Sequence, residues 1–158
     1  MNDSKDKIII GNCSGFYGDR LSAAKDMVEG GPIDVLTGDY LAELTMTILY
    51  NQKMQRGEEL GYVGTFLKQF KDVAVSCQEK NIKIVTNAGG LNPSSMASKI
   101  EEIVQELNLD LKVAYIDGDD LMPRFDELKD ADEPLSNMEK GISLHDYSKK
   151  PLTANVYF

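Results

Sequence analysis

The chain has 158 residues, 42% of them hydrophobic, which is enough for one average-sized domain with its own core. Its formal net charge of −9 has the wrong sign for a broad nucleic-acid interface, and two cysteines with a single histidine argue against a disulfide-stapled scaffold or a multi-histidine metal site. A polar start and the lack of an apolar run of about 20 residues predict a soluble, cytoplasmic protein with neither nucleic acid nor membrane among its partners.

The first part of the chain is predicted to form two strand–loop–helix units. Residues 7–11 are a β-branched run that ends in glycine, as is typical of a strand buried on both faces at the centre of a parallel sheet. Asp19 can cap the helix that follows, which ends at residues 30–32. Residues 33–36 are predicted to be a second strand and residues 40–56 a second helix. The buried positions expected on these helices are Leu21, Ala24 and Val28, then Leu41, Leu44, Ile48 and Leu49.

Similar elements continue through the middle of the chain. A helix is predicted over residues 65–80, with Phe66, Phe70, Val73 and Cys77 along one apolar stripe. A strand is predicted over residues 82–86. A further helix follows the N-cap Asn92, with Pro93 at its first position. A last strand is expected at residues 111–116. Strands that alternate with helices in this way predict an α/β fold, a parallel sheet flanked by helices in a Rossmann-like layered architecture.

The C-terminal part is less regular. Residues 1–6 are expected to be a polar tail and residues 7–158 one domain, in which about 129–150 form a polar excursion. Residues 152–158 become apolar again and no element follows to cover them. We therefore expect a piece of a longer protein, with its α/β domain incomplete at the C-terminus.

Glycine and polar residues follow four of the predicted strands, at residues 12–15, 37–39, 87–90 and 117–120. In an open α/β sheet these loops emerge at one edge, where ligands bind. Each loop alone is better explained as a turn, but four together favour a site. The candidate ligand-binding residues are Gly11, Asn12, Ser14, Gly15, Gly18, Arg20, Thr37, Asn87, Gly89 and Gly90.

The first of these loops, residues 11–18, could hold an anionic group on its backbone amides, helped by Arg20. Its glycine spacing matches neither common nucleotide-binding pattern, so phosphate, pyrophosphate and carboxylate stay open. Cys13 in this loop is a candidate nucleophile near a predicted helix N-terminus, although a small packed cysteine is the commoner role. Cys77 lies on an apolar helical stripe and is expected to be structural, so Cys13 should be the more reactive thiol.

Carboxylates supply the candidate acid–base and metal groups. Asp39 and Glu43 share a helix face, and a second group follows residue 116. Such groups can bind a divalent cation or act as a base, and acidic first turns also arise from the helix dipole alone. Asp39, Asp119 and Cys13 are the candidate catalytic residues, and the candidate metal ligands are Asp39, Glu43, Asp117, Asp119 and Asp120.

The glycine-rich first loop and the Asn-Ala-Gly sequence at residues 87–89 also resemble short-chain dehydrogenases, which would imply a nicotinamide-dependent oxidoreductase. Two details oppose this alternative. Tyr147 lacks a lysine four residues later, which those enzymes need, and Asn87 follows the third predicted strand instead of the fourth.

Several longer blocks closely resemble the acyclic terpene utilisation (AtuA-like) family in the same order. They are residues 11–20, 30–43, 84–93, 118–121 and 151–155, and they cover most of the chain from Lys7 onward. The resemblance implies the first part of an N-terminal domain, in a family associated with catabolism of citronellol- and geraniol-type compounds through branched acyl-CoA thioesters. It carries over no catalytic assignment.

Together these features suggest an enzyme domain that acts on a small anionic metabolite, such as a branched terpenoid acid or acyl-CoA. A CoA thioester and a divalent cation are the candidate cofactors. The alternative is a non-catalytic accessory module that binds acyl-CoA or a carboxylase partner, and a homo-oligomer is a further expectation. The sequence leaves the substrate and the reaction type open.

Overall fold

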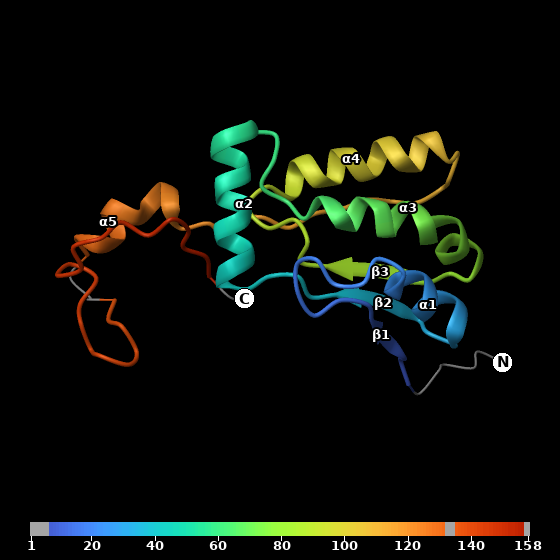
Figure 1. The fold of residues 1–158 in the computed structure, drawn as a ribbon, viewed down its shortest axis with the longest axis horizontal. Helices are drawn as coiled ribbons and strands as arrows, with labels where there is room; N and C mark the ends of the chain where they lie inside the picture. The colour runs from blue at the N-terminus through green and yellow to red at the C-terminus, as the bar shows by residue number, and fades with distance from the viewer. Residues whose placement is uncertain (1–6, 132–134, 157–158) are drawn as a thin grey trace. The chain divides into compact units, whose positions relative to one another are not determined.

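The computed structural model describes residues 7–131 and 135–156 (Figure 1). Contacts along the chain divide it between Ile116 and Asp117 into two units, which are described separately below. The α/β layers belong to the first unit.

The first unit contains a parallel sheet in the order β1-β2-β3, formed by β1 (Ile10–Asn12), β2 (Val35–Gly38) and β3 (Lys83–Thr86). Gly11 pairs with Leu36 and Leu36 with Ile84, so these residues form one row across the sheet. The parallel pairing of three strands confirms the predicted α/β class.

In the described part of this unit, four helices accompany the sheet (Figure 1). They are α1 (Ala23–Gly30), α2 (Glu43–Arg56), α3 (Gly64–Glu79) and α4 (Pro93–Glu106). α1 and α3 pack against each other, and α3 packs against α4. The apolar stripe predicted for α3 is confirmed, because Phe66, Phe70, Val73 and Cys77 are all buried.

The core lies on one face of the sheet. Leu36 of β2 is buried with Val28 of α1 and Val73 of α3 in one hydrophobic cluster. On the opposite face, Ile10 and Val85 are 63% and 61% exposed. No described element covers that face of the sheet.

The prediction that the first strand is central and buried on both faces is therefore wrong, although the strand itself is present. β1 is an edge strand, and Ile8 and Ile9 just before it are also exposed. A β-branched run predicts a strand, but burial depends on neighbouring elements that the run itself does not encode. Leu44, predicted to be buried on α2, is exposed as well.

The prediction of a fourth strand at residues 111–116 is also wrong. Leu111 and Val113 pack against the core, whereas Tyr115 and Ile116 are exposed. Within the described ranges no backbone hydrogen bond joins this segment to β3. Its apolar alternation thus reflects one-sided packing without strand pairing.

The second unit contains a short 3-10 helix η1 (Met122–Arg124) followed by α5 (Phe125–Lys129). Isolated bridges pair Asp120 with Asn155 and Ser136 with Ser143. Phe125 is its one buried apolar side chain among the residues that the structure describes. Throughout the described ranges, no helix is both long and apolar enough to cross a membrane.

Candidate functional site

The loops after β1, β2 and β3 meet at one edge of the sheet, the strand-end site. The Cys13 N–H donates to the Thr37 carbonyl over 2.8 Å, and the Asp39 N–H donates to the Ser14 carbonyl over 3.0 Å. The Thr86 hydroxyl donates to the Gly38 carbonyl over 2.9 Å. Three of the four predicted loops are thus brought together, while residues 117–120 belong to the second unit.

Asp39 and Asn87 form the central pair of this site. The Asn87 Nδ2 donates to Asp39 Oδ1 over 2.6 Å, and the Asn87 Oδ1 accepts from the Tyr40 N–H over 2.8 Å. These two bonds fix which way the amide of Asn87 points. Both side chains are exposed, and Asp39 Oδ2 has no hydrogen-bond partner in the described part of the chain. One carboxylate oxygen is therefore held and the other faces solvent.

The loop after β1 already holds a carboxylate of its own. Asp19 Oδ2 accepts from the Gly15 N–H over 3.0 Å, and Asp19 Oδ1 accepts from the Arg20 N–H over 2.7 Å. These backbone bonds hold the pKa of Asp19 below its usual range. The prediction that Asp19 caps α1 is wrong, because α1 begins at Ala23 with Ser22 before it. Asp19 bridges backbone amides of the loop instead.

Arg20 lies beside an open hollow of about 320 Å³. Its guanidinium pairs with Asp26 at 2.8 Å, and both side chains are more than half exposed. The hollow is lined by Asn12, Arg20, Ala23, Asp26, Met27, Gly30 and Gly31. In the loop that follows β1, Gly18 has φ +90°, a backbone conformation that favours glycine.

Tyr40 and Gln69 form a buried polar contact beneath the site, which the sequence pattern does not predict. The Tyr40 hydroxyl donates to Gln69 Oε1 over 2.6 Å, and burial is the main cause that raises the pKa of Tyr40. Gln69 lies between Phe66 and Phe70 on α3 and is itself buried. A glutamine at a buried helical position is the signal that could have revealed it.

Both cysteines are buried. Cys13 is 5% exposed and Cys77 is 1% exposed. Burial raises the pKa of Cys13 and raises that of Cys77 to about 11, while a hydrogen bond with Tyr40 partly offsets the rise at Cys13. The prediction that Cys13 lies near a helix N-terminus is wrong, because α1 begins only at Ala23. No helix end is among the causes of the shift in the pKa of Cys13.

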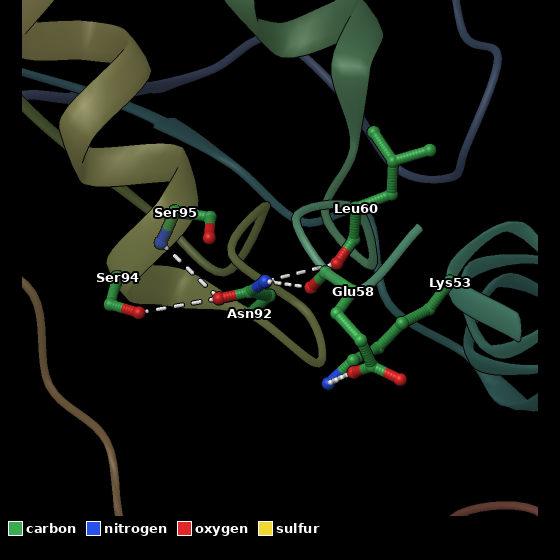
Figure 2. Close-up of polar contacts among 6 residues, drawn as sticks. All are labelled: Lys53, Glu58, Leu60, Asn92, Ser94 and Ser95. Carbon is green, nitrogen blue, oxygen red and sulfur yellow. Dashed lines mark hydrogen bonds and ion pairs between the residues drawn. The ribbon is translucent and has the colours of Figure 1, made fainter. Parts of the chain in front are cut away.

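The loop between β3 and α4 is packed tightly against the α2–α3 connection. A Cβ at Gly89 would lie 2.9 Å from the Pro93 Cα, and Gly90 has φ +54°. Asn92 accepts from the Ser95 N–H over 3.2 Å and donates to the carbonyls of Glu58 and Leu60 over 2.9 and 3.1 Å (Figure 2). The predicted N-cap is confirmed, and local structure accounts for both glycines, close packing at Gly89 and a positive φ at Gly90.

The remaining acidic candidates are divided between the two units. Glu43 is exposed at the first residue of α2, whereas Asp117, Asp119 and Asp120 lie in the second unit. Asp120 accepts from the Met122 N–H over 2.9 Å, which ties its carboxylate to η1. Among the described residues, no three His, Cys, Asp or Glu side chains are grouped as metal ligands would be.

A family model for the acyclic terpene utilisation family protein AtuA matches residues 8–158. The chain belongs to this family. Its resemblance to the AtuA-like blocks in the sequence is thereby confirmed, and membership relates the chain to acyclic terpene utilisation. No curated protein and no solved structure matches it.

The AtuA match includes the second unit, where two of the resembling blocks lie together. The Leu121 N–H donates to the Ala154 carbonyl over 2.8 Å, and the Val156 N–H donates to the Asp119 carbonyl over 2.9 Å. Asn155 Nδ2 also donates to Asp119 Oδ2 over 2.9 Å. Asp119 is therefore held by an asparagine amide, as Asp39 is in the first unit.

Proposed function

We propose that this AtuA-family chain forms an enzyme domain whose strand-end site acts on a small anionic metabolite, such as a branched terpenoid acid or its CoA thioester. The observation that carries the proposal is the pair of Asp39 and Asn87. Asn87 holds one carboxylate oxygen of Asp39 and leaves the other exposed beside the ends of three parallel strands. Ligands of open α/β sheets bind at such edges.

In this proposal Asp39 transfers a proton or holds a cation through Oδ2. A carboxylate that is oriented before the ligand arrives loses less freedom on binding, which favours both roles. Thr37 and Asn87 orient the substrate. Asp119, held in the same manner in the second unit, is a further candidate for acid–base or cation chemistry.

The loop of residues 11–18 is proposed to bind the negative group of the substrate, with Arg20 next to it. Support comes from Asp19, because its carboxylate already occupies the Gly15 and Arg20 amides. The same donors suit a carboxylate or phosphate of a ligand. A ligand would have to displace Asp19 to use them.

A non-catalytic accessory module is the second candidate. The uncovered sheet face favours it, because Ile10 and Val85 are each more than 60% exposed there. Exposed apolar patches commonly mark interaction surfaces. On this alternative the face would dock a carboxylase partner or another copy of the chain, and acyl-CoA would bind without being converted.

Product formation separates the two candidates. The protein is incubated with branched-chain acids and their CoA thioesters, with and without Mg²⁺, and products are followed by mass spectrometry. The enzyme proposal expects turnover that Asp39→Asn removes and that Asp72→Asn, at an exposed position of α3, leaves intact. Binding without any product would support the accessory module and reject the enzyme.

A further inference from the structure

A path of hydrogen bonds runs beneath the strand-end site and joins its loops. Tyr40 and Gln69 are only 1% and 2% exposed. The Tyr40 hydroxyl donates to Gln69 Oε1 over 2.6 Å, and Gln69 Nε2 donates to the Arg20 carbonyl over 3.5 Å. The second bond is long, and it gives the amide nitrogen of the buried Gln69 its partner, the carbonyl of Arg20.

Tyr40 extends the path to the third loop through its backbone. Its N–H donates to Asn87 Oδ1 over 2.8 Å, and the same amide donates to Asp39. The path therefore connects the loop after β1, at Arg20, with the loop after β3, at Asn87. Asp39, whose free oxygen faces solvent, lies next to Tyr40 in the chain.

Gly38 gives Tyr40 the space that this path needs. A Cβ at Gly38 would lie 2.6 Å from Cε2 of the Tyr40 ring. On α3, Phe66 meets the ring edge-on with centroids 5.9 Å apart. The ring is thus enclosed between the end of β2 and α3, which directs its hydroxyl toward Gln69.

We infer that Tyr40 and Gln69 are positioning residues of the strand-end site, which fix the loop after β1 relative to Asp39. The inference rests on the proposed function, because only a ligand site at this edge gives the positioning a purpose. Neither side chain faces a ligand, since both are buried. They act through the backbone of Arg20 and the amide of Asn87.

Two variants test the inference in the whole 158-residue chain. Gln69→Met removes both polar atoms and keeps an unbranched side chain of similar length, and Tyr40→Phe removes one oxygen. Loss of a buried hydrogen bond should raise hydrogen exchange at the Gly15 and Arg20 amides about tenfold or more, as measured by NMR. The pKa of Asp19, followed by carboxyl ¹³C shifts, should rise toward its ordinary value, because those amides hold it low.

Matched controls are available on α2, where Gln55 is exposed, Tyr50 is half-buried and neither side chain has a described hydrogen bond. Gln55→Met and Tyr50→Phe should leave the exchange rates and the pKa of Asp19 unchanged. If folded Gln69→Met and Tyr40→Phe left the exchange rates and the pKa of Asp19 unchanged, the inference would be overturned. If Gln69→Met does not fold, Tyr40→Phe alone decides. Neither measurement uses a ligand, so the result is independent of whether the site binds a metabolite.

Discussion

At the scale of single residues, Asn87 determines which oxygen of Asp39 a ligand can reach. Its amide carries a donor and an acceptor, and both are used: Nδ2 for the Asp39 carboxylate and Oδ1 for the Tyr40 N–H. An aspartate at position 87 would keep the acceptor but lose the donor and place a second negative charge beside Asp39. The identity of this residue therefore matters more than its polarity.

Gly38 is predicted to be intolerant of any side chain. In Gly38→Ala the new Cβ would lie 2.6 Å from the Tyr40 ring, so the ring or the strand end must shift. We expect urea denaturation to show a loss of about 1–3 kcal/mol in the free energy of unfolding. The control is Gly64→Ala, at an exposed position where a Cβ meets nothing within 4 Å. Equal stability of the two variants would contradict the packing described for Tyr40.

The two thiols should differ in the pH at which they react. Burial raises the pKa of each thiol, that of Cys77 to about 11, and only at Cys13 does an interaction with the Tyr40 side chain offset part of the rise. Because the thiolate is the reactive form, iodoacetamide labelling should be slow at neutral pH and increase at a lower pH for Cys13 than for Cys77. Mass spectrometry of each cysteine gives the rates, with urea-unfolded chain as the control. Faster labelling of Cys77 would reject this order.

The sequence predicted Asp39 and Asn87 because a single rule covers them: residues that follow parallel strands gather at one edge. The sequence does not predict Tyr40 and Gln69, because their proposed roles depend on contacts between residues far apart in the chain. Gln69 is 29 positions from Tyr40 along the chain, and its burial reflects how α3 lies against the loops. Asp19 was misassigned for a local reason, since a carboxylate near a helix start suits either a cap or a loop amide.

At the scale of elements, Asn92 joins α4 to the connection between α2 and α3. It caps α4 through the Ser95 N–H and ties the α2–α3 connection to it through the carbonyls of Glu58 and Leu60 (Figure 2). Asn92→Ala should lower the free energy of unfolding by about 1–3 kcal/mol, since it loses a cap and two further bonds. Ser94→Ala, which removes an exposed hydroxyl 3.3 Å from Asn92 Oδ1, is the control and should change stability little. If urea denaturation gave Asn92→Ala the same free energy of unfolding as the unchanged protein, the cap would be dispensable.

Helices were easier to predict than strands for a physical reason. The stripe of α3 and the Asn92–Pro93 start of α4 are local signals, and both are confirmed. Strand pairing depends on partners elsewhere in the chain. The segment 111–116 has the alternation of a strand but makes no described ladder, and β1 has the composition of a central strand but lies at the edge.

At the scale of the whole molecule, the buried core is concentrated in the first unit. Apart from Phe125, every buried apolar side chain among the described residues lies at or before Val104. Residues 1–116 alone should therefore fold, with a thermal transition by circular dichroism within a few degrees of that of the 158-residue chain. Loss of the cooperative transition in the shorter chain would mean that residues 117–158 are needed for folding.

The central claim is that Asp39 and Asn87 form the ligand-binding edge of this AtuA-family chain. The most direct measurement is an NMR titration of the ¹⁵N-labelled protein with branched-chain acids and their CoA thioesters, in which the side-chain amides of Asn87 and Asn92 are compared. Both belong to the loop that follows β3, but Asn92 is bonded to the protein backbone through both of its polar atoms. We expect the Asn87 amide and the Asp39 backbone amide to shift with the ligand while the Asn92 amide stays in place. Ligand-dependent shifts elsewhere in the chain, with Asn87 and Asp39 unmoved, would contradict the claim.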